Sequence, residues 1–356
     1  MPGDTTASPL PAAAEGRALP GVTVIATVRD EEPYLDAAVR SILDQDYPGD
    51  LRMVLSVGPS RDRTREIADE LAAQDDRLLV VENPTGSRSE GLNAGVRQAD
   101  PSHEIVVRID GHTVFEPTYV RRVVEVMLAA GADGAGGIMS PFGDTPVQAA
   151  IARAMSHPAG LGAAPFHVGG EPGPAETVYL GAFRRSAIER AGGFDHGIIR
   201  GEDWELCLRM RRNGSLLWFD PSLEVTYRPR RRLREVAKQF WRTGMWRREI
   251  VRRHPETASA RYLAPPAVVV ALGAAAAATV VGAILGQGVA VAAGATVLGG
   301  YVLGEVAAAA HAASRSPRLG WRSALLLPVV LMVMHMSWGA GFLRGVSGEA
   351  ATDHRT

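Results

Sequence analysis

The feature that most constrains this chain is a series of three long apolar stretches that begins after Pro265. They cover roughly residues 266–285, 288–310 and 324–343. A helix that crosses a bilayer core needs about 20 apolar residues, so each stretch is long enough to span. The first two are rich in Ala, Gly and Val, which let helices approach closely, and the short 286–288 link between them predicts a hairpin. We therefore expect a transmembrane region over residues 263–345.

Arginines flank these stretches in a consistent pattern. A dense basic run over residues 228–261 precedes the first stretch, and Arg315, Arg318 and Arg322 lie between the second and third. Basic segments stay on the cytoplasmic side of a membrane. Three spans would then place the N-terminal domain in the cytoplasm and the 346–356 tail outside. Glu305 falls in the second span, as an intramembrane functional carboxylate or as a residue near the interface. The alternative is a buried helical domain of a soluble protein.

Charge and cysteine content exclude several classes of protein. The formal net charge of the chain is −1, which argues against an electrostatic nucleic-acid binder. The single cysteine, Cys207, excludes an intrachain disulfide and a cysteine-based zinc site. Residues 1–20 are rich in Ala, Pro, Gly and Thr and lack the apolar core of a signal peptide, so we expect a disordered tail there.

The polar part of the chain alternates β-type and α-type patterns. Apolar, β-branched runs at residues 22–28, 51–57, 78–81 and 104–109 read as buried strands, with amphipathic helices expected from 35, over 63–73 and from 92. This alternation predicts an α/β domain over 21–230 with a doubly wound, mixed but mostly parallel sheet, followed by a basic interfacial helix over 231–262. Ligands bind such sheets at the carboxyl ends of the strands. The residues to inspect are therefore 27–32, 58–62, 83–91 and 110–113.

Asp110 and His112 follow the fourth strand, where the chain turns at Gly111. Both side chains could reach one metal ion. A carboxylate with an imidazole suits Mn²⁺ better than Mg²⁺, which prefers oxygen ligands. Diphosphate oxygens of a nucleotide donor would complete the shell, because a departing nucleoside diphosphate develops negative charge that a divalent cation neutralises. A plain structural turn is the alternative.

A second acidic pair, Glu202 and Asp203, opens a helix that runs to Arg212. Asp203 lies in the first helical turn, where the helix dipole favours the ionised carboxylate. An ionised carboxylate at the edge of a cleft can accept a proton from an acceptor hydroxyl. The alternative is a helix N-cap, and the two roles are compatible.

Two weaker segments complete the set of candidates. Gly181 interrupts a short apolar run that leads towards Glu202. Gln239 and Arg242 lie with Trp246 in the basic, aromatic run before the first apolar stretch. Arginines there can pair with phosphate and tryptophans suit a membrane interface, although a generic interfacial helix would show the same pattern.

Taken together, these motifs resemble the family 2 glycosyltransferases of GT-A fold. Asp30-Glu31 stands where the family has Asn-Glu after its first strand, and the following helix ends in the Gln45-to-Pro48 motif. The other matching motifs are Ser60, Asp62 and Thr64 of the Ser-x-Asp-x-Thr turn, Asn83-Pro84, the segment 91–95 (GLNAG), and RIDGH at 108–112, an Arg-x-Asp-x-His form of the family's Asp-x-Asp. This set covers roughly residues 20–255 and is similar to the ExoA-type enzymes of exopolysaccharide synthesis.

The resemblance implies an inverting transfer by a single displacement, and the arginine pattern places it at the cytoplasmic face of the inner (plasma) membrane. It makes Asp203 the general base with Glu202 beside it, and Asp110 and His112 the metal ligands. It further implies donor-binding roles for Thr27, Arg29, Asp30, Glu31, Asp62, Asn93, Arg108 and Asp110, and acceptor- or phosphate-binding roles for Gly181, Trp204, Gln239 and Arg242. Thr243 stands where processive relatives carry a tryptophan, so processivity is not supported.

The donor is expected to be a nucleotide sugar, with UDP as the family's usual nucleotide. The second strand, however, ends in Ser56-Val57-Gly58 and lacks the acidic residue that usually contacts the nucleobase, so GDP and dTDP stay open. The expected acceptor is a polyprenyl-linked saccharide or a polysaccharide, with polysaccharide-assembly proteins as further partners. The missing acidic residue also motivates an alternative function, a non-catalytic, membrane-anchored scaffold with a GT-A-like domain.

Overall fold

The structure, a computed structural model, describes residues 19–346, so the expected tails at 1–20 and 346–356 lie almost entirely outside the described residues. The chain divides into two compact units. Within the described residues, the sheet unit contains 19–139 and 169–226, and the helical unit contains 140–168 and 227–346. Each unit is described separately below.

One sheet of eight strands forms the centre of the sheet unit, in the order β3-β2-β1-β4-β7-β5-β8-β6. Strands β1 to β4 pair in parallel, whereas β7 is antiparallel to β4 and β5, and β6 is antiparallel to β8. The predicted mixed, doubly wound sheet is confirmed. The strands are β1 (Gly21–Val28), β2 (Leu51–Val57), β3 (Leu78–Glu82), β4 (His103–Asp110), β5 (Gly134–Pro141), β6 (Gly173–Pro174), β7 (Tyr179–Arg184) and β8 (Leu217–Tyr227).

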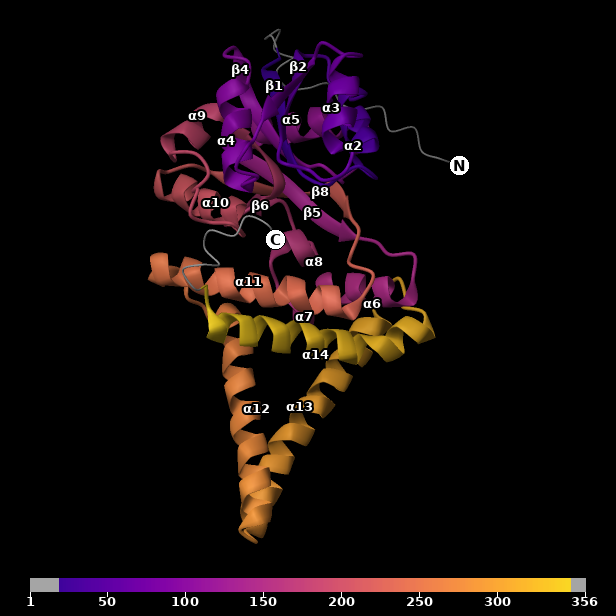
Figure 1. Cartoon of the computed structure of the whole chain (residues 1–356), viewed down its shortest axis with the longest axis vertical. Coiled ribbons are helices and arrows are strands. Elements are labelled where there is room, and N and C mark those ends of the chain that lie inside the picture. Colours follow the sequence, from indigo (N-terminus) through magenta and orange to yellow (C-terminus); the bar gives the residue numbers. More distant parts are fainter. Residues whose placement is uncertain (1–18, 347–356) are drawn as a thin grey trace. The chain divides into compact units, whose positions relative to one another are not determined.

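Helices cover both faces of this sheet, as the continuous apolar sequence of β1 requires (Figure 1). Val24 and Ala26 point into the core formed with α2, α3 and α5, while Ile25 points into the core formed with α4, α9 and α10. Each buried Val or Ile side chain contributes about 1.5–3 kcal/mol. The helices are α2 (Leu35–Leu43), α3 (Thr64–Ala72), α4 (Arg88–Gln98), α5 (Tyr119–Ala130), α9 (Arg185–Arg190) and α10 (Glu202–Arg212).

Helix α4 begins at Arg88, one turn before the predicted start. Gly91, expected to precede the helix, lies inside it. A Cβ at this position would collide with Thr27 Oγ1 of β1. The glycine therefore serves the close approach of helix and strand rather than the helix start, and the first turn of α4 comes to the carboxyl end of the sheet.

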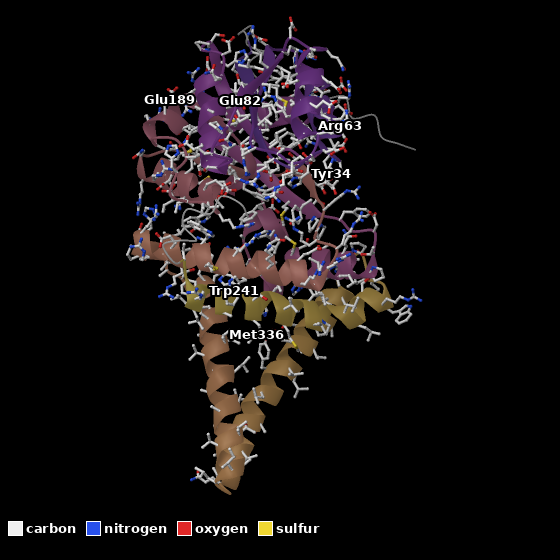
Figure 2. All side chains as sticks on the ribbon, viewed as in Figure 1. Tyr34, Arg63, Glu82, Glu189, Trp241 and Met336 are labelled. Carbon is white, nitrogen blue, oxygen red and sulfur yellow. The ribbon has the colours of Figure 1, made fainter. Side chains whose placement is uncertain are left out.

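The helical unit contains the three apolar helices, each long and apolar enough to cross a membrane by length and composition. Two of them, α12 and α13, form the predicted hairpin (Figure 1). Their side chains are almost all hydrocarbon (Figure 2), and Ile284 and Val289 beside the turn are 77% and 86% exposed. The unit's helices are α6 (Pro146–Met155), α7 (Pro158–Leu161), α8 (Pro165–Val168), α11 (Leu233–Arg253), η1 (Pro255–Thr257), α12 (Ala260–Ile284), α13 (Gly288–Ser314) and α14 (Trp321–Arg344).

Helix α14 packs differently from α12 and α13. It runs beside α11, and two glycines bring the backbones together: a Cβ on Gly244 would collide with Trp338 O, and one on Gly341 with Trp241 O (Figure 1). Small residues allow such close helix contacts. A third of the apolar window of α14 is buried, against 17% for α12 and 11% for α13. The sequence alone gave no sign of this difference.

Glu305 of α13 is buried and pairs with α14. Its Oε1 lies 2.8 Å from His335 Nδ1, and His335 Nε2 lies 2.7 Å from the carbonyl oxygen of Ala159 after α7. The carboxylate thus joins α13 to the rest of the helical unit, a role that neither of the two sequence-based readings included.

Candidate active site

The site in the sheet unit is built on the carboxyl end of β4. Asp110 is the last residue of this strand and pairs in register with Thr27 of β1. Asp110 Oδ1 lies 3.1 Å from Arg108 Nη2 and 3.3 Å from Arg88 Nη1. Two arginines, one from β4 and one from the first turn of α4, therefore share one carboxylate.

The acidic pair of α10 completes this group. Glu202 Oε1 lies 3.4 Å from Arg108 Nη2 and 3.7 Å from Arg88 Nε, and Asp203 Oδ2 lies 3.7 Å from Arg108 Nη1. We call these five residues (Arg88, Arg108, Asp110, Glu202 and Asp203) the Arg108 cluster. It brings together two motifs that are far apart in the sequence, and it holds one more carboxylate than guanidinium.

Burial and ion pairing act against each other within the Arg108 cluster. Burial alone would raise the pKa of Asp110, but Arg108 and Arg88 outweigh it and lower this pKa to about 2. For Glu202 burial prevails: it raises the pKa, Asp203 adds to the rise, and the two arginines oppose it. Asp110 is thus ionised at neutral pH, while Glu202 ionises less readily than an ordinary glutamate.

The two acidic residues of α10 differ in exposure. The Glu202 side chain is 5% exposed and that of Asp203 is 31% exposed. Gly201, with φ 82°, occupies the N-cap position, so Asp203 is not the N-cap residue. Asp203 Oδ1 accepts a hydrogen bond from the Trp204 N–H (2.7 Å), while the Trp204 ring is buried. Of the two residues, only Asp203 can contact a ligand without a movement of the surrounding side chains.

His112 pairs with Glu31 from the loop after β1. His112 Nδ1 lies 2.9 Å from Glu31 Oε1. The hydrogen bond to Glu31 raises the pKa of His112; burial opposes this, and Asp110 adds to the rise. This pair uses Nδ1, so a metal ligated by His112 would be held through Nε2, with Glu31 fixing the ring. Within the described residues, no group of three side chains with metal-binding atoms includes Asp110 or His112.

The remaining residues of the β1–α2 loop bind the β2–α3 loop. Asp30, at a φ of 55°, accepts the Arg61 N–H on Oδ1 (2.7 Å), and Arg29 Nε lies 3.8 Å from its Oδ2. Asp62 accepts hydrogen bonds from the backbones of Glu32 (3.1 Å) and Thr64 (3.0 Å). The structure shows Asp30 and Asp62 shaping these loops, and their predicted contact with the nucleoside stays a prediction.

Three further predicted residues, the half-buried Thr27 and the buried Asn93 and Gly181, pack within the sheet unit. Thr27 Oγ1 accepts a hydrogen bond from Asn83 Nδ2 (3.3 Å). Both ends of the Asn93 amide bond the Phe194 backbone at 2.8 Å, which holds the chain segment that leads to α10. A Cβ on Gly181 in β7 would collide with the side chain of Val178. These contacts give all three a structural role, and their ligand-binding roles stay predictions.

The sequence motifs did not identify Arg88 as a site residue. It falls in the 83–91 loop flagged at the end of the third strand, but an arginine there carries no motif of its own. Only the early start of α4 brings it to Asp110. The first turn of a helix that begins at the carboxyl end of a parallel sheet is the signal that could have found it.

Gln239 and Arg242 lie on α11 in the helical unit. Gln239 Nε2 donates to the Tyr227 hydroxyl (3.3 Å), and Arg242 is half-buried. Their predicted contact with acceptor or phosphate stays a prediction.

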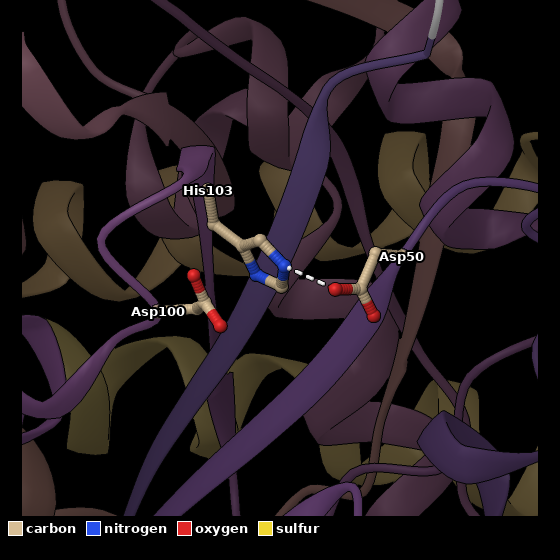
Figure 3. A group of neighbouring side chains, drawn as sticks. All are labelled: Asp50, Asp100 and His103. Atoms are coloured by element: carbon tan, nitrogen blue, oxygen red, sulfur yellow. Dashed lines mark hydrogen bonds and ion pairs between the residues drawn. The ribbon is translucent and has the colours of Figure 1, made fainter.

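A second group with metal-binding atoms lies at the amino ends of the strands, opposite the candidate site (Figure 3). Ligand atoms of Asp50, Asp100 and His103 lie within 4.8 Å of one another, so the group could hold a metal ion. His103 Nδ1, however, lies 2.8 Å from Thr23 Oγ1 and Nε2 lies 3.0 Å from Asp50 Oδ2. Both ring nitrogens of His103 therefore already have hydrogen-bond partners in the protein. These bonds connect the amino ends of β1, β2 and β4.

Comparison with known proteins agrees with this geometry. The sequence profile of glycosyl transferase family 2 matches residues 23–192, which include β1, β4 and the loops between them. The succinoglycan biosynthesis protein ExoA of Rhizobium meliloti (strain 1021) is 30% identical over 316 residues, 88% of this chain and 92% of that protein. The chain belongs to glycosyl transferase family 2. The expected family and the expected glycosyltransferase activity are confirmed.

Two more distant proteins resemble this family 2 glycosyltransferase. The dolichyl N-acetyl-alpha-D-glucosaminyl phosphate 3-beta-D-2,3-diacetamido-2,3-dideoxy-beta-D-glucuronosyltransferase of Methanococcus voltae is 22% identical, over 61% of this chain and 70% of that protein. The mannosyltransferase PcManGT of Pyrobaculum calidifontis, solved with GDP-Man and Mn²⁺, superposes with a TM-score of 0.56 at 18% identity, over 88% of this chain and 86% of that one. The latter likeness confirms the predicted GT-A fold.

Proposed function

We propose that this family 2 enzyme is an inverting, metal-dependent transferase that moves a sugar from a nucleotide-sugar donor to a lipid-linked or polysaccharide acceptor. The observation that carries the proposal is the Arg108 cluster at the carboxyl ends of the strands. It combines an ionised, ion-paired aspartate at the end of β4 with an accessible aspartate at the start of α10. These are the two chemical groups that a single displacement on a nucleotide sugar requires.

We assign the divalent metal to Asp110 and His112, with Mn²⁺ preferred over Mg²⁺. The residues fit the ion in chemical type: Asp110 is ionised, and the Glu31 bond leaves Nε2 of His112 for a metal. When bound, the cation neutralises charge on the departing diphosphate. The excess of carboxylates in the Arg108 cluster supports this, because a diphosphate without a cation would meet net negative charge. The Mn²⁺ and GDP-Man bound to PcManGT are consistent with this assignment.

We assign the general base to Asp203 and a positioning role to Glu202. Asp203 takes the proton of the acceptor hydroxyl as that oxygen attacks the anomeric carbon. The bond from this carbon to the diphosphate breaks on the opposite face, which inverts the configuration. Glu202 is buried and holds Arg88 and Arg108 in place. The arginines then face the phosphates of the donor, where guanidinium groups form strong charge-assisted hydrogen bonds.

A donor screen tests this proposal. The full chain in detergent is heated with UDP-, GDP- and dTDP-sugars, with and without Mn²⁺, since a ligand that binds the folded state raises the melting temperature. We expect one donor class to stabilise the protein only with Mn²⁺. Asp110→Ala should abolish this shift, whereas Asp203→Asn should keep the shift and lose transfer by about a thousandfold or more. The screen also identifies the nucleobase of the donor. The sequence does not specify it, because β2 ends without the acidic residue that usually contacts the nucleobase.

Asp100→Asn is the matched control for the metal. It alters the Asp50–Asp100–His103 group at the amino ends of the strands (Figure 3), so it should leave the Mn²⁺-dependent shift in melting temperature unchanged. If Asp100→Asn removed the shift and Asp110→Ala kept it, the metal assignment would be wrong. If no donor bound with or without Mn²⁺ and no hydrolysis occurred, the non-catalytic scaffold would replace the transferase.

We further propose that α12 and α13 cross the inner membrane, with the basic segments on the cytoplasmic face, and that α14 lies along that face. The sequence pattern predicted three spans. The support for two is that α14 packs along α11, which is rich in arginine and unsuited to the hydrocarbon core. It also contacts α12 at Pro265 and α13 at Glu305, near the ends of the hairpin far from its turn.

Single cysteines distinguish the two topologies. Leu325 and Leu343 are 70% and 44% exposed near the two ends of α14, and Ile284 is 77% exposed at the hairpin turn. Burial raises the pKa of the native Cys207 thiol to about 11, so it should stay unlabelled. With a membrane-impermeant maleimide, cysteines at 325 and 343 should label from one side and a cysteine at 284 from the other. Labelling of 325 and 343 from opposite sides would restore three spans.

A further inference from the structure

The helical unit contains a group of hydrogen-bond donors around Tyr262, in the first turn of α12. The Arg247 guanidinium of α11 lies 4.1 Å from the centre of the Tyr262 ring, and that of Arg261 lies 5.4 Å from it. Trp338 of α14 stacks on the same ring at 6.2 Å with an interplanar angle of 16°. With His167 of α8, we call these residues the Tyr262 cluster.

Several donors in the Tyr262 cluster are buried without an acceptor. Among the described residues, Arg261 Nε, Trp338 Nε1 and His167 Nδ1 have no hydrogen-bond partner. The arginine and tryptophan groups can only donate, so no rotation or change of protonation satisfies them. Folded proteins rarely leave buried donors unpaired, because the lost hydration is not repaid. The two groups that can only donate, Arg261 Nε on α12 and Trp338 Nε1 on α14, therefore indicate a bound acceptor.

The charge around Arg261 indicates what kind of acceptor fits. Two guanidinium groups flank one aromatic ring, and no ion pair of Arg261 with an acidic residue occurs in the described chain. Burial lowers the pKa of His167 to about 3, and the nearby Arg261 adds to this shift. Gly162, at φ +74°, packs closely on this arginine: a Cβ there would lie 2.8 Å from Arg261 Nε.

We propose that the Tyr262 cluster binds the phosphate group of a membrane lipid phosphate, the link between lipid and sugar in the acceptor. The role as acceptor rests on the proposed function, whereas the binding of a lipid phosphate does not. Guanidinium and indole N–H groups are suitable donors to phosphate oxygens. The lipid chain would follow α12, where Leu263, Val270 and Val281 are 42%, 57% and 51% exposed. A free phosphate would gain nothing from this apolar surface.

A binding measurement on the full chain tests the site. The protein is placed in phosphatidylcholine nanodiscs and titrated with polyprenyl phosphate, and separately with inorganic phosphate and pyrophosphate. Arg261→Gln should weaken binding of polyprenyl phosphate by about tenfold or more, because a charge-assisted hydrogen bond is lost, and Trp338→Phe, which keeps the ring, by about threefold. Arg252→Gln is the control: this arginine is exposed and pairs with Glu249, so affinity should not change.

The other outcomes separate this proposal from its rivals. Equal affinity in Arg261→Gln, Trp338→Phe and the wild type would overturn the site. Inorganic phosphate that binds as tightly as the polyprenyl compound would overturn the lipid as ligand. Nucleotide-sugar binding is measured on the same samples and should be unaffected by both variants. If no nucleotide sugar bound but polyprenyl phosphate did so through Arg261, the proposed function would fail while this site stood.

Discussion

The Arg108 cluster and the Tyr262 cluster each contain an arginine with a buried Nε, but the two clusters balance the charge of that arginine in opposite ways. In the first, both guanidiniums are shared among three carboxylates within 3.7 Å. In the second, Arg261 faces an aromatic ring and its Nε lacks an acceptor in the described chain. A buried charge must be paired, either by the protein or by a ligand. The first cluster therefore balances the charge of its arginines within the protein, even though Arg108 Nε has no hydrogen-bond partner among the described residues, and the second cluster does not.

The largest expected effect comes from breaking the ion-paired cluster. Arg108→Gln leaves the buried Glu202 and the partly exposed Asp110 with one guanidinium fewer, which should destabilise the sheet unit by about 3 kcal/mol or more. The matched change in the other cluster, Arg261→Gln, removes a donor without an acceptor and should change stability by less than about 1 kcal/mol. Local unfolding of each unit by hydrogen exchange gives both values. Similar losses of stability in Arg108→Gln and Arg261→Gln would contradict the proposed difference between the two clusters.

A smaller effect should appear in the pH dependence of the helical unit. His167 has a pKa of about 3 in the folded chain against 6.5 in the unfolded chain, so between these values the unfolded state binds more protons. The stability from this residue is complete above pH 6.5 and is lost as the pH falls towards 3. At pH 5 the loss should be about 1–2 kcal/mol.

Substituting His167→Phe should flatten this dependence, measured by hydrogen exchange over α7 and α8 from pH 7 to pH 5. Saturating polyprenyl phosphate should also flatten it in the wild type, because a bound anion raises the pKa of a neighbouring histidine. A pH profile that is the same in wild type, variant and lipid-bound protein would show that His167 is not part of a positively charged, anion-binding group.

The sequence by itself determined the parts whose burial follows a local period. The continuous apolar run of β1 predicted a strand covered on both faces, the end of the fourth strand located Asp110, and the local motif at Glu202 marked the start of α10. The lengths of α12 and α13 and their short link predicted the hairpin. These features depend on residues close together in the chain, because the period of apolar side chains is set by the element itself.

Only the tertiary structure decided which distant side chains meet. Glu202 reaches Arg108 across 94 residues, and the Arg88–Asp110 contact depends on the first turn of α4 coming to the sheet. The position of α14 beside α11 depends on close contacts at Gly244 and Gly341. The apolar sequence of α14 does not predict these contacts. Hydropathy records that a side chain avoids water but not what it packs against, so partners separated by many residues are set by the packing of whole elements.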